Sequence, residues 1–124
     1  MITNNTVLES SFKIQCIYVE QYAKEYMRAK LNIANYQFLK STVREQDLNY
    51  NAIDLKKEIN YSYLKNYVTY IDNILSMLDS EQQYIIKKEF FGIKTKNWWI
   101  SDYSRSTFYR LKRKAVTQFL MYAS

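Results

Sequence analysis

Apolar residues recur at steps of three and four positions along most of the chain, which is the spacing of one face of an α-helix. The first such stripe predicts a long helix over about residues 8–44, opened by a capping box at residues 6–9 and bent near residues 32–35. Its apolar positions are Leu8, Phe12, Cys16, Val19, Ala23, Tyr26, Ile33, Tyr36, Leu39 and Val43. We expect this helix either to pack against the rest of the chain or to serve as a partner surface or dimer seam.

A polar break at residues 46–51 separates this helix from the next apolar stripe. The pattern allows a short helix over residues 52–59, after which Asn60 or Ser62 can cap a helix over residues 62–78. The stripe of that second helix comprises Leu64, Tyr67, Val68, Ile71, Ile74, Leu75 and Leu78. Two helices with a break at residues 60–62 are therefore the prediction for this part of the chain.

Another helix start follows at residues 79–83, where Ser80 and Gln83 stand at capping-box spacing. The helix carries Tyr84, Ile85, Ile86 and Phe90 and is expected to end near Gly92, with lysines in its last turn. Residues 94–101, which contain both tryptophans, then predict a turn or a brief helix. We expect Trp98 and Trp99 to pack in the core rather than to stack on bases, with one of them exposed.

The last stripe predicts a helix over residues 104–122 with two different faces. Ser104 is a suitable N-cap, because its hydroxyl can accept a backbone N–H of the first turn. The expected core positions are Phe108, Leu111, Ala115, Phe119 and Tyr122. The opposite face carries Ser106, Arg110, Arg113 and Thr117. An apolar back and an Arg/Ser/Thr front suit a helix in a DNA major groove, although a solvated basic face has the same pattern.

Composition favours an all-α fold. The 124 residues include no proline and a single glycine, so hairpin turns that need glycine have little support and long helices are not interrupted. We expect two parts, an N-terminal helical extension over residues 1–60 and a second domain over residues 61–124.

Positive charge is concentrated in the C-terminal third. Residues 87–114 hold nine lysines and arginines against two acidic residues, a net charge of +7, whereas the rest of the chain carries −1. A local excess of this kind is typical of a surface that binds nucleic acid. Lys87 and Lys88 are more typical of a solvated face or of partners for the helix dipole.

Several classes of function find no support in the residue content. The chain has no histidine and one cysteine, Cys16, which leaves no set of soft metal ligands and no intrachain disulfide. No glycine-rich phosphate loop or paired-carboxylate motif is present, so we expect neither an enzyme nor a cofactor. No apolar run is long enough to span a membrane and no signal-peptide core is visible, so we expect a cytoplasmic protein.

Two runs give the chain a family resemblance. LSMLDSEQQYIIKKEFF, followed by an aromatic turn and then YSRSTFYRLKRKAVTQFL, resembles region 4 of bacterial sigma factors, and more closely the small phage transcriptional regulators of the ArpU/RinA type. The similarity covers about half of the chain, roughly residues 63–122. It differs in one place: the usual first helix of the helix-turn-helix motif is replaced by the shorter run of residues 97–103.

The resemblance implies an all-α fold in which a long N-terminal helix precedes a helix-turn-helix bundle like sigma region 4. It implies a DNA-binding function in transcription regulation, with double-stranded DNA as the partner. The implied DNA-binding residues, together with the flanking basic residues, are Arg105, Ser106, Thr107, Tyr109, Arg110, Lys112, Arg113 and Lys114. The alternative is a factor that binds RNA polymerase through the same module, and a homodimer through the N-terminal helix is a further expectation.

Overall fold

The computed structural model describes residues 10–42, 52–92 and 95–124, and within these ranges it contains four helices and no strand. The helices are α2 (Phe12–Thr42), α3 (Ala52–Met77), α4 (Ser80–Phe90) and α5 (Arg105–Tyr122). The all-α fold with a long N-terminal helix is thereby confirmed.

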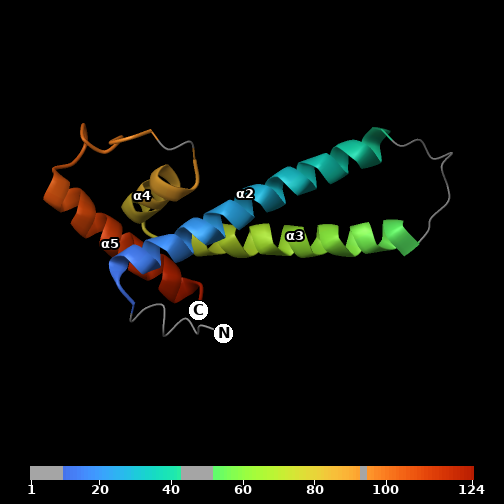
Figure 1. Ribbon diagram of the computed structural model, residues 1–124, viewed down its shortest axis with the longest axis horizontal. Coiled ribbons are helices and arrows are strands. Elements are labelled where there is room, and N and C mark those ends of the chain that lie inside the picture. The colour runs from blue at the N-terminus through green and yellow to red at the C-terminus, as the bar shows by residue number, and fades with distance from the viewer. Residues whose placement is uncertain (1–9, 43–51, 93–94) are drawn as a thin grey trace.

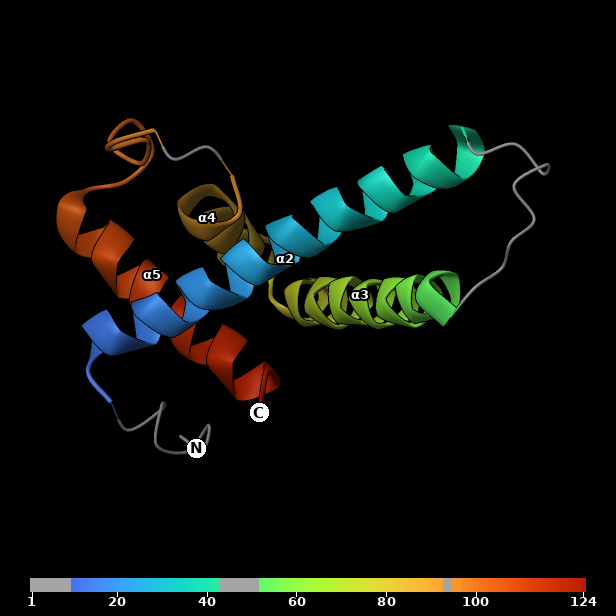
Figure 2. The same ribbon diagram turned by 45° about the vertical axis from the view of Figure 1, so that its right-hand side comes forward.

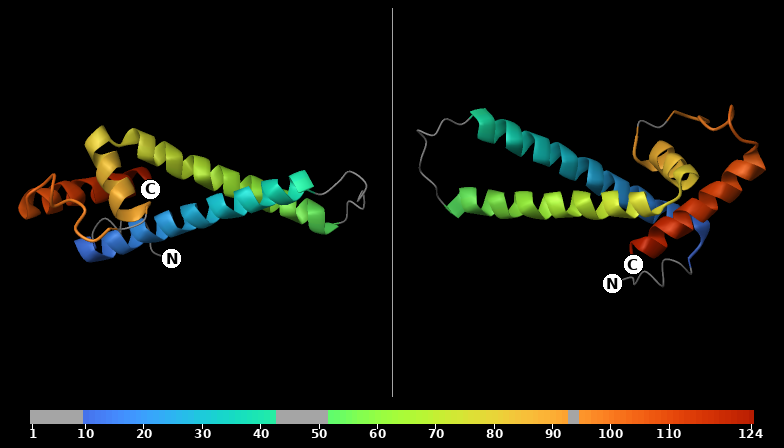
Figure 3. Two further views of the ribbon diagram at one scale, coloured as in Figure 1. Left: turned by 90° about the horizontal axis from the view of Figure 1, so that it is seen from above. Right: turned by 180° about the vertical axis from the view of Figure 1, so that it is seen from behind.

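The long helices α2 and α3 run antiparallel and side by side, and α4 and α5 lie at one end of the pair (Figure 1). Helix α5 crosses the N-terminal part of α2, as Figure 2 shows. The other end of the pair projects away from α4 and α5 in every view (Figure 3). We call this projecting part, residues 30–42 and 52–66, the arm.

One hydrophobic core lies where the four helices meet. The side chains of Val19, Ile71 and Phe119 are fully buried in it, and α4 adds Ile86. Edge-to-face ring contacts link α2 to α5 and to the end of α4, with centroid distances of 5.8 Å between Tyr22 and Phe119 and 5.4 Å between Tyr26 and Phe91. The predicted core residues Val19 and Tyr26 of the first helix are confirmed, whereas Phe12 and Cys16 are only partly buried.

Tyrosine hydroxyl groups fasten α3 to the helices beside it. The Tyr26 hydroxyl donates to Asp72 Oδ1 at 2.7 Å, Tyr67 donates to the Tyr22 carbonyl at 3.2 Å, and Tyr70 donates to the Ala123 carbonyl at 2.8 Å. Burial, together with the hydrogen bond to Asp72 and the carboxylate charge, raises the pKa of Tyr26 to about 12. Burial first, and the neighbouring Glu25 carboxylate second, also raise the pKa of Tyr67.

The arm has no such core. Among its described side chains, residues 30–41 and 57–66, none is buried, and Leu31, Ile59 and Tyr63 are largely exposed. Its two helices are held by the stacked rings of Tyr36 and Tyr61, 4.4 Å apart, and by a 2.9 Å hydrogen bond from Gln37 Nε2 to the Tyr61 hydroxyl.

Two predicted helix boundaries differ from the structure. Asn60 and Ser62 lie inside α3, so the predicted break at residues 60–62 is wrong, and the expected domain boundary at residue 60 falls within a continuous helix. The N-cap of α4 is Asp79 rather than Ser80: its carboxylate accepts from the Gln82 N–H at 2.7 Å, and Gln82 Oε1 accepts from the Asp79 N–H at 3.3 Å. The charged carboxylate makes the stronger cap of two adjacent candidates.

The first helix begins at Phe12, later than expected. Ser11 precedes it, and its hydroxyl accepts from the Ile14 N–H at 3.4 Å. The predicted capping box at residues 6–9 and the polar break at residues 46–51 lie outside the described residues. Within the described residues, α2 is one continuous helix through residues 32–35, and no helix is long and apolar enough to cross a membrane.

Candidate functional site

The basic helix α5 starts where the sequence predicts. Ser104 has extended backbone angles, φ −71° and ψ 159°, and its hydroxyl accepts from the Thr107 N–H at 3.3 Å. The same hydroxyl donates to Thr107 Oγ1 at 2.8 Å. Ser104 is therefore confirmed as the N-cap, and Thr107, an expected DNA-binding residue, is half-buried with its hydroxyl engaged in the cap.

The buried face of α5 is turned relative to the predicted stripe. Its buried residues are Phe108, Ala115, Val116, Phe119 and Leu120, whereas Leu111 and Tyr122, both expected in the core, are only partly buried. The predicted stripe allows for one covering helix. In the structure α5 packs against α2, α3 and α4, and Val116 and Leu120 belong to the core that the four helices share.

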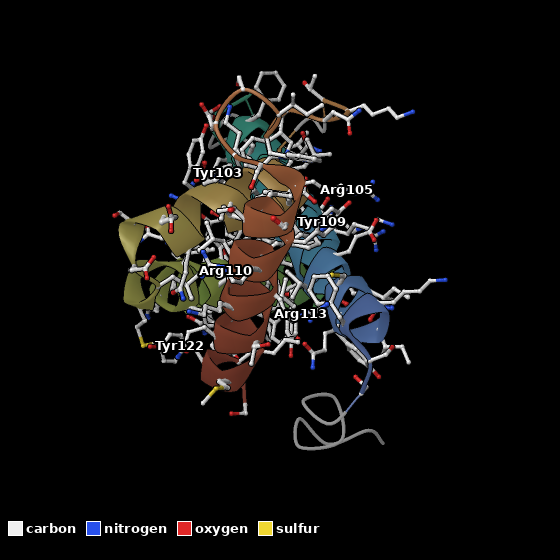
Figure 4. All side chains as sticks on the ribbon, turned by 90° about the vertical axis from the view of Figure 1, so that its left-hand side faces the viewer. Tyr103, Arg105, Tyr109, Arg110, Arg113 and Tyr122 are labelled. Atoms are coloured by element: carbon white, nitrogen blue, oxygen red, sulfur yellow. The ribbon has the colours of Figure 1, made fainter. Side chains whose placement is uncertain are left out.

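The outer face of α5 carries cations and no acidic residue. Arg105, Ser106, Tyr109, Arg110, Arg113 and Lys114 are all exposed. Figure 4 shows Arg110 on the side of α5 toward α4, and Arg113 on the side toward α2. Six of the eight expected DNA-binding residues therefore share one accessible face, which we call the basic face.

The basic face borders a shallow concave region of about 600 Å³. It is lined by Gln82, Ser106, Tyr109, Arg110, Arg113, Lys114, Thr117 and Gln118. Gln82 comes from the first turn of α4, so the hollow spans two helices. Amide, hydroxyl and guanidinium groups side by side can bind either phosphate oxygens or the acceptor atoms of bases.

Lys112 is not part of the basic face. Its ammonium lies 2.8 Å from Glu89 Oε2, and the side chains of Lys112 and Glu89 are only 14% and 5% exposed. The other carboxylate oxygen of Glu89 accepts from the Trp98 indole N–H at 2.6 Å. Lys112 was expected on the flank, where it would reach a phosphate, but here it joins α5 to α4 and to the tryptophan turn.

Aromatic rings gather around Phe108 in the turn that precedes α5. The Trp99 ring stacks on Phe108 at 4.7 Å, and the Trp98 ring meets it edge-on at 5.5 Å. Tyr103 completes the cluster, 6.1 Å from the same ring. Both tryptophans are half-buried: they pack on Phe108 but lie outside the main core in which they were expected, and neither is exposed, as was expected of one of them.

The turn that carries the tryptophans is built without glycine. Asn97 has a φ of 59°, the left-handed conformation that asparagine tolerates better than most residues. The Tyr103 N–H donates to the Trp99 carbonyl at 2.9 Å, which closes a single helical turn. A turn was predicted here, and it brings the chain directly to the N-cap of α5.

The exposed N-terminal end of α5 carries a cation and a ring in contact. The Arg105 guanidinium lies over the Tyr109 ring at 6.0 Å, and that ring meets Trp99 edge-on at 6.1 Å. Arg105 and Tyr109 are thereby linked to the aromatic cluster, although both stay exposed.

Sequence reasoning missed the contribution of other helices to this site. Gln82 lines the hollow from α4, and two α2 residues reach α5: Phe12 lies against the Arg113 guanidinium, and Gln15 accepts a hydrogen bond from the Thr117 hydroxyl at 3.5 Å. About a hundred positions separate Gln15 from Thr117, so no local pattern could have paired them.

The site offers no grouped metal ligands. Within the described parts of the chain, no cluster of three or more histidine, cysteine, aspartate or glutamate residues could hold a metal ion. Comparison of the chain with protein-family models, with curated proteins and with solved structures finds no match in any of the three.

Proposed function

We propose that this protein binds double-stranded DNA and regulates transcription, with α5 as the recognition helix in the major groove. The observation that carries the proposal is the basic face: a capped helix of 18 residues that buries one side and exposes arginine, lysine, serine and tyrosine on the other. The resemblance of residues 103–120 to the recognition helices of ArpU/RinA-type regulators supports the same assignment.

The residues of the basic face divide into two roles. Arg110 lies on the side of the exposed face toward α4 and Arg113 on the side toward α2, and arginine can form two parallel hydrogen bonds to guanine O6 and N7. Lys114 and Arg105 are exposed on the same face and suit phosphate contacts, which add affinity without sequence preference. Thr107 and Lys112 act in this proposal through the cap and the Glu89 pair, respectively, and not by direct contact.

The test is duplex binding across a series of salt concentrations, on sites selected from a random pool. Arg110→Ala should weaken binding by about 1–3 kcal/mol and relax the preference at one base pair. Lys114→Ala should weaken binding to all sequences alike and lower the salt slope by about one unit. Lys57→Ala, which removes an exposed charge from the arm, is the matched control and should leave binding unchanged.

A wild-type protein that selects no sequence and binds duplex DNA without salt dependence would overturn the proposal. Equal losses for Lys57→Ala and Lys114→Ala would also count against it, because they would mean that net charge alone determines binding.

RNA polymerase is the second candidate partner, and one observation favours it. The arm exposes Leu31, Ile59 and Tyr63, which are apolar and aromatic side chains of the kind found in protein interfaces rather than phosphate-binding surfaces. In that case the protein co-purifies with polymerase after nuclease treatment, and charge reversal at Arg110 and Arg113 abolishes the association.

A further inference from the structure

The N-terminal turn of α2 lies against the same part of α5 that carries the basic face. The Arg113 guanidinium lies over the ring of Phe12, 5.2 Å from its centroid, and the Lys112 ammonium is 5.9 Å from the same ring. Further along, the Thr117 hydroxyl donates to Gln15 Oε1, and the Gln15 side chain is buried between the helices. Two successive turns of α5 are therefore contacted by the first turn of α2.

The two cations beside Phe12 differ in their exposure to solvent. Lys112 is turned inward, where Glu89 neutralises it at 2.8 Å. Arg113 remains exposed on the side of α5 toward α2, as Figure 4 shows. An exposed arginine normally samples many rotamers, and fixing them on binding costs free energy. A ring under the guanidinium restricts those rotamers before any ligand arrives, because the cation is attracted to the ring face.

We propose that Phe12 is a positioning residue for Arg113, so that the first turn of α2 is a functional part of the DNA-contacting surface. This inference rests on the proposed DNA-binding function. The Phe12 ring holds the Arg113 guanidinium at the edge of the basic face, with its N–H groups free to turn toward a guanine or a phosphate. The N-terminal helix thus acts on recognition as well as on stability.

The contact itself can be tested without DNA. The ring current of Phe12 should shift the Nε–H resonance of Arg113 in an NMR spectrum of the free protein. Phe12→Leu keeps an apolar side chain but removes the ring, and the resonance should move toward the position of an unstructured arginine. Phe12→Tyr should restore the shift. An Arg113 resonance that is the same in wild type and Phe12→Leu would overturn the positioning role.

The consequence for binding is measured by a double-mutant cycle on the selected duplex. Phe12→Leu should weaken binding roughly three- to five-fold in the wild-type background, as expected for one surface cation–π contact. In the Arg113→Ala background the same change should have little further effect. Phe91→Leu, the same substitution at a ring packed against Tyr26 and Phe119, is the control and should leave binding unchanged.

The outcomes separate this inference from the function on which it rests. Absence of selective duplex binding by the wild type refutes the proposed function, while the NMR result still decides the Phe12–Arg113 contact. Selective binding with independent, additive effects of Phe12→Leu and Arg113→Ala refutes the inference and leaves the proposed function intact. If Phe91→Leu and Phe12→Leu weakened duplex binding equally, Phe12 would act through packing alone and the positioning role would be refuted.

Discussion

Glu89 is a single carboxylate that serves two partners from different parts of the chain, the Lys112 ammonium and the Trp98 indole. Lys112→Met should leave this carboxylate buried without its counter-ion and lower the free energy of unfolding by about 3 kcal/mol. Urea denaturation measures the difference. Lys114→Met removes an exposed lysine from the same helix and should change stability by less than about 0.5 kcal/mol. Similar values for the two variants would show that the pair contributes little.

Tyr26 gives the protein a predictable response to alkaline pH. Its pKa is raised from 10.0 to about 12 in the folded state, so the folded protein holds the phenol proton more tightly than the unfolded chain. The stabilisation is therefore complete below pH 10.0 and is lost as the pH rises toward about 12. Tyr26→Phe removes the hydrogen bond to Asp72 and should cost about 1 kcal/mol at neutral pH.

The stability curves of wild type and Tyr26→Phe should converge as the pH rises through that window, which thermal melts at several pH values can follow. Curves that stay parallel would show that the Tyr26 hydroxyl does not lose its proton there. The other tyrosines with raised pKa values, Tyr22, Tyr67 and Tyr103, are present in both proteins and act on both curves alike.

Single residues were predictable where their role is local. Ser104 caps α5 through an N–H three positions away, so the sequence alone identifies it. Lys112 was placed on a flank because helical spacing says nothing about what approaches from outside. Its burial depends on Glu89, a residue of another helix, and on rings of α2 and α4.

Helix α2 packs through one face, and a charge placed on that face tests the packing. Val19 is completely buried, so Val19→Asp should lower stability by several kcal/mol through an unpaired buried charge. Ile17, on the same helix, is 45% exposed, and Ile17→Asp should cost far less. Thermal denaturation of the two variants compares them directly. An unchanged melting temperature for Val19→Asp would place this face of α2 in solvent.

The helix types were predictable, but two junctions were not. Asn60 and Ser62 are good caps, yet nothing in the sequence requires a cap to be used, and as exposed residues of a continuous helix they are tolerated. Asp79 and Ser80 compete for the same N–H groups, and the choice between them shifts the helix start by one residue. Local signals thus fix the helices more reliably than the junctions between them.

At the scale of the whole molecule, stability is uneven along the α2–α3 pair. The end beside α4 and α5 carries the core, whereas the described side chains of the arm include no buried residue. Amide hydrogens near Ile71 should therefore exchange only on global unfolding, and those near Ile59 by local opening of lower free energy. Exchange measured by NMR residue by residue tests this. Equal protection along α3 would mean that the arm is covered in solution.

Such a cover could be a second copy of the chain, the homodimer expected from the N-terminal helix, which stays a prediction. Sedimentation equilibrium at several concentrations tests it, and Leu31→Glu on the exposed side of the arm should then shift the equilibrium toward the monomer. The core combines Val19 with residues of α3, α4 and α5, so residues 1–60 and 61–124 share one core rather than each having its own.

The two tryptophans of the aromatic cluster allow the candidate site to be followed by fluorescence. The chain has two tryptophans, and both pack on Phe108 in the turn that precedes α5. Emission excited beyond the tyrosine absorption band therefore comes from this turn alone, although there are thirteen tyrosines. Opening of the arm would leave the tryptophan emission unchanged, whereas detachment of α5 from α4 would expose both indoles and shift their emission to the red.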